Sequence, residues 1–226
     1  TDGTITITAS GGTGSLQYSI DNGVTFQASN TFTGLGAATY NIVVEDASGC
    51  QTTSTATLSD PAAVNITNVA TVDPTCNGGS DGTITITASG GTGSLQYSID
   101  NGVTFQASNT FTGLGAATYN IVVEDASGCQ TTSTATLTDP AAVNITNVAT
   151  VDPTCNGDTD GTITITASGG TGSLQYSIDN GVTFQASNTF TGLAAATYNI
   201  VVEDASGCQT TSTATLIDPA AVSITN

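Results

Sequence analysis

The sequence predicts an all-β protein made of three tandem β-sandwich domains in an elongated rod. The chain has 226 residues and repeats with a period of 79, as the equivalence of Asp2, Asp81 and Asp160 shows. Within each copy, Ile, Val, Leu, Phe and Tyr alternate with Thr between turns rich in Gly, Asn and Asp, and no segment has helical periodicity. A unit of this length is too long for a solenoid repeat and suits a small domain with its own core.

The Asp139-Pro140 pair interrupts the strand pattern and ends one copy. We therefore expect a first repeat at residues 1–61, which lacks its leading strand, a second repeat at residues 62–140 and a third at residues 141–219. Residues 220–226 then begin a further repeat. These three copies are named repeats 1, 2 and 3 below.

The composition excludes several classes of partner. The chain has 18 acidic residues, no Lys, Arg or His, and a net charge of -18. Nucleic acids and anionic membranes bind basic residues, so neither is expected as a partner. No apolar run approaches the roughly 20 residues of a membrane span, so no membrane insertion is expected. The usual bases and oxyanion partners of an active site are missing too, so we do not expect an enzyme.

The first half of repeat 2 shows strands separated by turns. Residues 83–88 alternate with period two, residues 90–93 form a Gly-rich turn, and residues 94–99 alternate again. Residues 100–102, Asp-Asn-Gly, predict a tight hairpin turn, because Asn and Gly tolerate the positive φ that such turns require. The next strand is expected at residues 103–105. The residues predicted to face the core are Ile84, Ile86, Ala88, Leu95, Tyr97 and Ile99.

The second half continues the pattern. A strand begins at Tyr119, a turn follows at residues 126–128, and residues 129–137 form the closing strand. After the Asp-Pro pair, residues 143–151 form one more strand. This gives about seven strands per copy, with turn signals roughly every 8–12 residues. The residues predicted to face the core here are Tyr119, Ile121, Val123, Ala135 and Leu137.

Each repeat also carries the sequence pattern of a tyrosine corner. A Leu lies five residues before a Tyr, with a small-residue turn between them and an alternating strand afterwards. In immunoglobulin-like sandwiches the hydroxyl of such a Tyr ties the connection between the two sheets to nearby backbone. The pattern therefore predicts immunoglobulin-like domains. Its residues are Leu35, Tyr40, Leu114, Tyr119, Leu193 and Tyr198.

Two kinds of cysteine alternate along the chain, which favours disulfides in an extracellular protein. One kind follows Ser-Gly before the closing strand, and the other lies in Pro-Thr-Cys-Asn-Gly. Metal binding is less favoured, because there is no Cys-x-x-Cys pair and no His. The five disulfide candidates are Cys50, Cys76, Cys129, Cys155 and Cys208.

Three pairing schemes remain open. Pairs Cys50–Cys76 and Cys129–Cys155 require the strand after the Asp-Pro pair to fold back on the closing strand. Pairs Cys76–Cys129 and Cys155–Cys208 keep each bridge inside one repeat, but standard sandwich order places those positions at opposite ends of a domain. A third pairing, Cys76–Cys208, links neighbouring domains end to end. The first scheme is slightly favoured.

No cofactor is expected, and calcium is the one possibility that the acidic residues raise. Residues 156–161 resemble the first half of an EF-hand loop, but Ala167 at the twelfth position cannot supply the bidentate carboxylate, so a polar turn is favoured. A calcium site at a domain junction would need several oxygens to converge. The candidate ligands there are Asp60, Asp139, Glu124, Asp125, Glu203 and Asp204.

Four stretches of repeat 2 form a combined motif: Cys76 to Gly93, Tyr97 to Gly102, Phe111 to Tyr119, and Val123 to Cys129. Together they resemble the SprB repeat family, whose repeats fill very large cell-surface adhesins of gliding bacteria. The resemblance implies export to the bacterial cell surface and a long repetitive stalk. It implies adhesion to a substratum or a surface polysaccharide as the role of the wider protein, and no catalytic residues.

The leading hypothesis is a non-catalytic stalk or spacer in a secreted adhesin, next to further copies of the repeat in a longer chain. The second is a subunit of a self-assembling extracellular filament. The chain begins without the strand equivalent to residues 143–151 and ends with part of it at residues 222–225, so strand donation between chains would use both ends. Arbitrary ends within a longer array explain the same pattern and are favoured. The third is a glycan-binding module, which exposed aromatic residues would support, but Tyr97, Phe105 and Phe111 are expected in the core.

Overall fold

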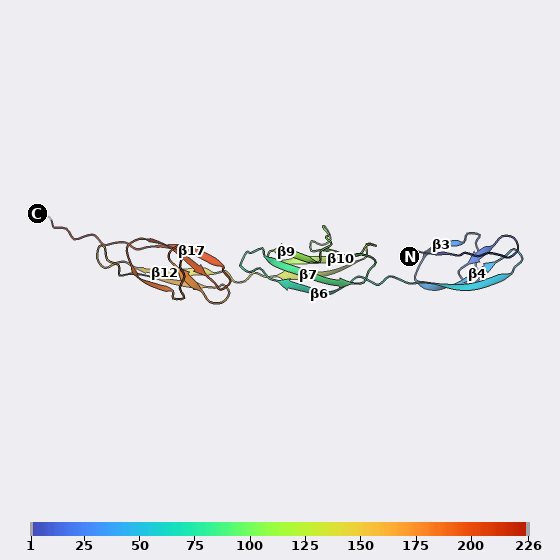
Figure 1. The fold of residues 1–226 in the computed structure, drawn as a ribbon, viewed down its shortest axis with the longest axis horizontal. Coiled ribbons are helices and arrows are strands. Elements are labelled where there is room, and N and C mark those ends of the chain that lie inside the picture. Colours follow the sequence, from blue (N-terminus) through green and yellow to red (C-terminus); the bar gives the residue numbers. More distant parts are fainter. Residues whose placement is uncertain (1, 225–226) are drawn as a thin grey trace. The chain divides into compact units, whose positions relative to one another are not determined.

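The computed structural model describes residues 2–224, and in that range the chain forms strands, turns and loops without a helix (Figure 1). The chain divides into two compact units, residues 1–63 and 64–226. Repeat 1 makes up most of the first unit, and the second unit holds repeat 3 and all of repeat 2 except its residues 62 and 63. In the described residues, no helix is long and apolar enough to cross a membrane.

Repeat 2 folds into two antiparallel three-stranded sheets. One sheet has the order β6-β7-β9 and the other the order β11-β10-β8. Hydrophobic residues from both sheets pack into one core between them, with Ile84, Ile86, Ile121 and Val123 at its centre. The strands are β6 (Asn65–Val72), β7 (Gly82–Ser89), β8 (Gln96–Ser98), β9 (Thr110–Leu114), β10 (Ala117–Glu124) and β11 (Gln130–Leu137).

Repeat 3 has the same topology. Its sheets have the orders β12-β13-β15 and β14-β16-β17, again with antiparallel pairs only among the named strands. A separate core cluster lies between them. The strands are β12 (Asn144–Val151), β13 (Gly161–Ser168), β14 (Gln175–Ser177), β15 (Thr189–Leu193), β16 (Thr197–Glu203) and β17 (Gln209–Thr215).

Repeat 1 has one strand fewer within the described residues. Its sheets are the two-stranded β1-β3 and the three-stranded β2-β4-β5. The counterpart of β7 is β1, which is four residues long where β7 is eight. The strands are β1 (Gly3–Thr6), β2 (Gln17–Ser19), β3 (Thr31–Leu35), β4 (Ala38–Glu45) and β5 (Gln51–Leu58).

The alternation of Ile and Thr explains the position of the core. In β7 the side chains of Ile84 and Ile86 are 0% exposed, while Thr83 and Thr85, which alternate with them, stay half-buried. Full burial of one such Ile contributes about 1.5–3 kcal/mol. The inward positions predicted on the strands are confirmed, whereas Phe105, also expected in the core, is half-buried in a loop outside the core cluster. Those fully buried are Ile84, Ile86, Ile121, Val123, Ala135 and Leu137, and those packed against the core and half-buried are Ala88, Leu95, Tyr97, Ile99 and Tyr119.

The strand expected at residues 103–105 is wrong. The Asn-Gly turn before it does have positive φ, at 63° for Asn101 and 81° for Gly102. However, the carboxylate of Asp100 accepts hydrogen bonds from the backbone N–H groups of Val103 and Thr104, at 3.1 and 2.9 Å. These N–H groups are therefore not available to a strand ladder. Val103 is 80% exposed, and each full repeat has six strands instead of seven.

The Tyr hydroxyl of each corner pattern donates a hydrogen bond to the backbone of the connection that joins the two sheets. The hydroxyl of Tyr119 donates to the carbonyl oxygen of Gly115 at 2.9 Å, in the connection from β9 to β10. The preceding Leu114 ends β9 and packs half-buried against the core. This bond fastens one sheet to the other, as a tyrosine corner does. The equivalent bonds, also at 2.9 Å, join Tyr40 to Gly36, after Leu35, and Tyr198 to Ala194, after Leu193.

We expect the triple variant Tyr40→Phe, Tyr119→Phe, Tyr198→Phe to be less stable by about 0.5–1.5 kcal/mol per repeat, because each repeat loses one hydrogen bond. For domains of this size the thermal midpoint then falls by roughly 4–8 °C per kcal/mol. The matched control is Tyr18→Phe, Tyr97→Phe, Tyr176→Phe, whose hydroxyls have no hydrogen-bond partner in the described part of the chain. Equal losses in both triple variants, measured by calorimetry, would contradict the role of the corner.

Candidate functional site at the repeat junction

The second unit contains a covalent link between two repeats. Cys76, in the β6–β7 loop, forms a disulfide with Cys208, in the β16–β17 loop, with the two Cα atoms 5.5 Å apart. The sequence separation of the two residues is 132, and the connecting segment 138–143 joins the same two repeats. Repeats 2 and 3 are therefore joined twice, by the main chain and by the disulfide.

Antiparallel pairing explains why these two loops meet. Because β6 runs antiparallel to β7, its last residues lie at the end of repeat 2 where β11 also ends. There the carboxylate of Asp73 accepts hydrogen bonds from the backbone N–H and the hydroxyl of Thr138, both at 2.9 Å. The β16–β17 loop lies at the opposite end of repeat 3, where β12 begins. The disulfide therefore crosses the junction.

An aspartate holds the Cys208 loop in place. The Oδ1 atom of Asp204 accepts hydrogen bonds from the N–H groups of Ser206 and Cys208, at 2.8 and 2.9 Å. Its Oδ2 atom accepts the N–H of Thr171 at 2.6 Å. These donors, Thr171 first, keep the pKa of Asp204 below its ordinary value. The carboxylate thus fixes the backbone of the cysteine that makes the junction disulfide.

The connecting segment lies against a glycine pair in repeat 3. The N–H of Gly170 donates to the carbonyl oxygen of Ala141 at 3.0 Å. A Cβ atom on Gly169 would lie 2.0 Å from the carbonyl oxygen of Ala142, and one on Gly170 would lie 2.7 Å from Val143 Cγ2. Only glycine permits this approach. It places Val143, 9% exposed, in the core cluster of repeat 3.

The same segment also binds the Cys76 loop of repeat 2. The N–H of Gly78 donates to Asp139 Oδ2, and the side-chain amide of Asn77 donates to the carbonyl oxygen of Pro140, both at 3.0 Å. The segment is therefore fixed to both repeats. The Asp-Pro pair that interrupts the strand pattern in the sequence is a structural part of the junction.

The favoured pairing of Cys50 with Cys76 and of Cys129 with Cys155 is wrong. It required the strand after each Asp-Pro pair to fold back on the preceding closing strand. Instead β6 pairs with β7, and β12 with β13. Each leading strand thus carries its cysteine to the far end of its own sandwich, and the pairing found is Cys76–Cys208. The three remaining cysteines, Cys50, Cys129 and Cys155, are free and exposed.

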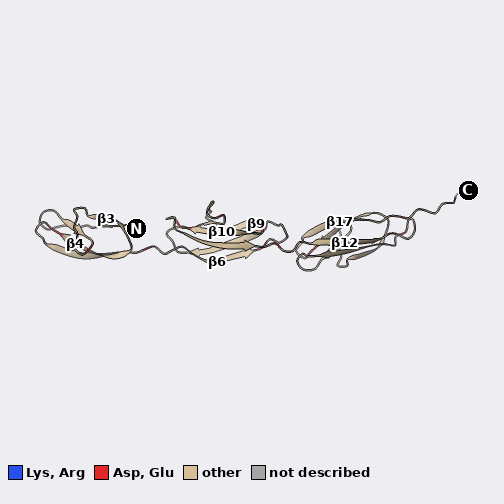
Figure 2. Cartoon of the chain, turned by 180° about the vertical axis from the view of Figure 1, so that it is seen from behind, with Lys and Arg blue, Asp and Glu red and all other residues tan. Residues whose placement is uncertain are grey.

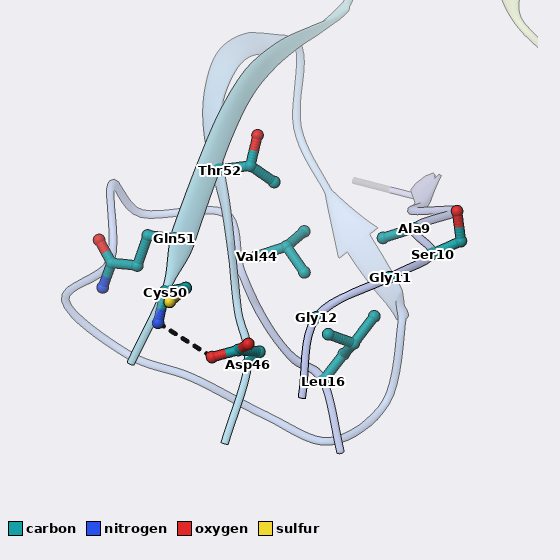
Figure 3. A pocket seen from close by; sticks show the side chains of 10 residues that line it. All are labelled: Ala9, Ser10, Gly11, Gly12, Leu16, Val44, Asp46, Cys50, Gln51 and Thr52. Atoms are coloured by element: carbon teal, nitrogen blue, oxygen red, sulfur yellow. Dashed lines mark hydrogen bonds between the residues drawn. The ribbon is translucent and has the colours of Figure 1, made fainter. Parts of the chain in front are cut away.

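The position equivalent to the Cys208 loop in repeat 1 borders an open cavity of about 220 Å³ (Figure 3). Gly11, Gly12, Leu16 and Val44 line it beside Cys50, and we name these five residues with Asp46 the N-terminal socket. Asp46 holds Cys50 as Asp204 holds Cys208, with its Oδ1 atom accepting the Cys50 N–H at 2.9 Å. The N–H of Thr13 is the main donor that lowers the pKa of Asp46.

The structure does not gather the candidate calcium ligands. No group of three or more His, Cys, Asp or Glu side chains among the described residues is arranged to hold a metal ion. Asp125 and Asp204 accept backbone N–H bonds, Asp139 binds Gly78, and Asp60 is exposed. Glu124 and Glu203 accept hydrogen bonds from Gln130 and Gln209. Acidic residues lie in loops and at strand ends throughout the described chain (Figure 2).

A second set of aspartates organises the loop after the short strand of each repeat. Asp179 accepts hydrogen bonds from the hydroxyls of Thr183 and Ser177, at 2.6 and 2.7 Å. With the backbone N–H of Thr183, these donors lower the pKa of Asp179 to about 2. The same arrangement, with Ser19 as first cause, lowers the pKa of Asp21 to about 2, and that of Asp100 is lowered as well. The sequence predicted the Asn-Gly turn in these loops but not the role of the aspartate, for which the signal is the Ser-x-Asp-x-x-x-Thr spacing.

The fold and the junction together define a class of protein: tandem immunoglobulin-like β-sandwich repeats with a disulfide between successive repeats. The family model described as SprB repeat matches residues 1–25, 68–104 and 147–183. The family model therefore matches one segment in each of the three repeats, and this match agrees with the family that the sequence motifs indicated. The matched stretches include Cys76 and its equivalent Cys155, but not Cys208, the partner of Cys76 in the junction disulfide.

Solved structures give further similarities. The N-terminal eight Ig domains of Down Syndrome Cell Adhesion Molecule match at 12% identity and TM-score 0.39, over 91% of this chain and 33% of that one. A C-terminal fragment of intimin in complex with the intimin-binding domain of its translocated receptor matches at 15% identity and TM-score 0.37, over 67% of this chain and 64% of that one. Domains 1–6 of surface layer protein SbsC match at 13% identity and TM-score 0.32, over 92% of this chain and 35% of that one. The chain thus spans less than two thirds of each of these structures. Among curated protein sequences, none matches it.

The lowered pKa values predict how the chain responds to acid. Because the folded pKa of Asp21 and Asp179 is about 2, below about 3.9 for an unfolded aspartate, their stabilisation is complete above about pH 4. It is lost as the pH falls from about 4 to about 2. We expect carboxyl ¹³C NMR titrations with midpoints near 2 for both residues. Thr183→Val should raise the midpoint of Asp179 and leave Asp21, the internal control, unchanged; equal shifts at both would contradict the local cause.

Proposed function

We propose that the chain is a non-catalytic structural spacer in a secreted bacterial cell-surface adhesin. The observation that carries the proposal is the Cys76–Cys208 disulfide between repeats 2 and 3. A spacer must keep its length and direction, and two covalent connections at one junction restrict bending and rotation there. Near-identical copies suit this role, since the function then depends on the number and stiffness of repeats instead of on one unique site.

The charge and the aromatic residues support the same role. A net charge of -18 without cations makes neighbouring stalks repel each other and keeps the surface soluble. Tyr97 and Phe111 pack against the core of repeat 2, so they are not displayed for stacking on a sugar. Adhesion to a substratum or polysaccharide is accordingly assigned to the whole protein, with gliding motility as its setting in the family. The role of this chain is to supply the length of the stalk.

The spacer role predicts how the chain extends under tension. When the ends are pulled, the disulfide carries the force directly from residue 76 to residue 208 and shields the residues between them. Since the separation is 132 residues, reduction should release roughly 450 Å of additional chain on unfolding. Single-molecule force spectroscopy measures this as extra unfolding steps after reduction.

The variant pair Cys76→Ser, Cys208→Ser should extend fully without reductant. Cys155→Ser, which changes a free cysteine, is the matched control and should behave as the original chain does. Equal extension of the oxidised and reduced chains would mean that the disulfide carries no tension and would contradict the spacer proposal.

A further inference from the structure

Every proline of the chain follows an aspartate. An Asp-Pro bond has its own nucleophile, because the aspartate carboxylate can attack its own main-chain carbonyl carbon through a five-membered ring. It also has a good leaving group, since the proline nitrogen belongs to a tertiary amide without an N–H and leaves readily once it is protonated. All five pairs lie outside the strands: Asp60-Pro61, Asp73-Pro74, Asp139-Pro140, Asp152-Pro153 and Asp218-Pro219.

The structure gives the carboxylates of two of these pairs different surroundings. Asp73 has both oxygens occupied, because Oδ1 accepts the N–H and Oδ2 accepts the hydroxyl of Thr138, each at 2.9 Å. Asp139 has one oxygen occupied, since Oδ2 accepts the N–H of Gly78 at 3.0 Å and Oδ1 accepts no hydrogen bond within the described residues. Both aspartates are exposed to solvent. Asp139 therefore has an oxygen available for attack, whereas Asp73 must first break a hydrogen bond.

The two prolines differ in the same direction. Pro74 is buried, whereas Pro140 is half-buried. A displaced proline nitrogen has to move away from the carbonyl carbon before the bond closes again. A buried ring stays in place and favours closure, so the burial of Pro74 also makes the Asp73-Pro74 bond the more resistant of the two.

The junction disulfide encloses the Asp139-Pro140 bond. This bond lies between Cys76 and Cys208 in the sequence, whereas the Asp73-Pro74 bond lies outside the enclosed segment. The Cys76 loop also holds both sides of the bond. Gly78 donates its N–H to Asp139, and the side-chain amide of Asn77 donates to the carbonyl oxygen of Pro140 at 3.0 Å. A cut at this position therefore leaves both new ends attached to repeat 2.

We propose that the Asp139-Pro140 bond is a site of self-cleavage in mild acid, and that the Cys76–Cys208 disulfide keeps repeats 2 and 3 joined after the cut. This site goes beyond the spacer role and does not depend on it. Acid then converts the junction from one that is joined twice into one that is joined by the disulfide alone. Reduction, which does not separate the uncut chain, separates the two repeats of the cut one.

The chemistry consumes one water molecule. Asp139 Oδ1 bonds to the main-chain carbonyl carbon of Asp139, the bond from that carbon to the nitrogen of Pro140 breaks, and the nitrogen takes a proton from the acid. The intermediate is a cyclic anhydride at residue 139. Water opens this anhydride, which leaves an aspartate as one chain end and a proline as the other.

The first test incubates the full chain, with its disulfide intact, at about pH 4, where the loops held by aspartate keep their stability. Intact-mass spectrometry at early times identifies each cut by its own fragments. We expect a chain that has gained the mass of one water and that gives residues 1–139 and 140–226 only after reduction. The cut at Asp73 separates residues 1–73 from 74–226 without reduction. It should be slower by about tenfold or more, because one more hydrogen bond to a carboxylate has to break.

The second test changes the hydrogen bonds and the reacting groups. Thr138→Val frees Oδ2 of Asp73, so the cut at Asp73 should speed up by about tenfold while the cut at Asp139 keeps its rate. Thr134→Val, which changes an exposed threonine of β11, is the matched control and should alter neither rate. Asp139→Asn removes the nucleophile and keeps an acceptor for Gly78, and Pro140→Ala removes the tertiary amide. Each should abolish the cut at residue 139 and leave the cut at Asp73 unchanged.

Four results would overturn the proposal. One is a folded chain that stays whole at residue 139 while the chain unfolded in guanidinium chloride is cut there. Another is equal rates at Asp73 and Asp139 in the folded chain, since the surroundings of the carboxylate would then have no effect. A third is a cut that persists in both Asp139→Asn and Pro140→Ala, and a fourth is separation of residues 1–139 from 140–226 without reduction. The force measurements above test the spacer role separately.

Discussion

The absence of any cation determines how this chain holds its loops. Its 18 carboxylates cannot form side-chain ion pairs, and each buried one would be costly without hydrogen-bond donors. The structure meets this constraint with backbone N–H groups and hydroxyls. Asp46, Asp125 and Asp204 each accept bonds from several backbone N–H groups, and Asp21, Asp100 and Asp179 combine backbone N–H groups with Ser and Thr hydroxyls. Loop shape is thereby tied to the ionised state of aspartate.

The junction depends directly on this arrangement. Asp204 fixes the N–H of Cys208, and Asp139 receives the N–H of Gly78 beside Cys76. Both halves of the disulfide therefore lie in loops that an aspartate organises. Since Asp46 and Asp125 place Cys50 and Cys129 in the same geometry, every repeat presents a cysteine prepared for the same bond.

The sequence predicted those features that depend on one strand and its neighbours along the chain. Alternation identified Ile84 and Ile86 as core residues, and the Leu and Tyr spacing pointed to the residues that bridge the sheets at Tyr119. It failed where a nearby side chain competes with a strand ladder for backbone N–H groups. The strand at residues 103–105 was expected because its side chains alternate, but the Asp100 carboxylate takes its N–H groups.

The cysteine pairing failed for a related reason. The residues around Cys76 do not reveal whether the leading strand joins the closing strand before it or β7 after it, and this choice decides at which end of a sandwich the cysteine lies. Sequence spacing therefore left three schemes open. Only the register of β6 on β7 separates them.

The segment that the disulfide encloses does not coincide with one folded repeat. A sandwich spans one period of 79 residues, whereas the disulfide spans 132, so Cys155 lies inside the segment that Cys76 and Cys208 enclose. Where the same pairing recurs along an array, successive enclosed segments overlap, and no main-chain junction is without a second covalent connection. In repeat proteins, stability is approximately a sum of repeat terms and nearest-neighbour terms. Between repeats 2 and 3 the nearest-neighbour term includes a covalent bond, in addition to the hydrogen bonds of the connecting segment.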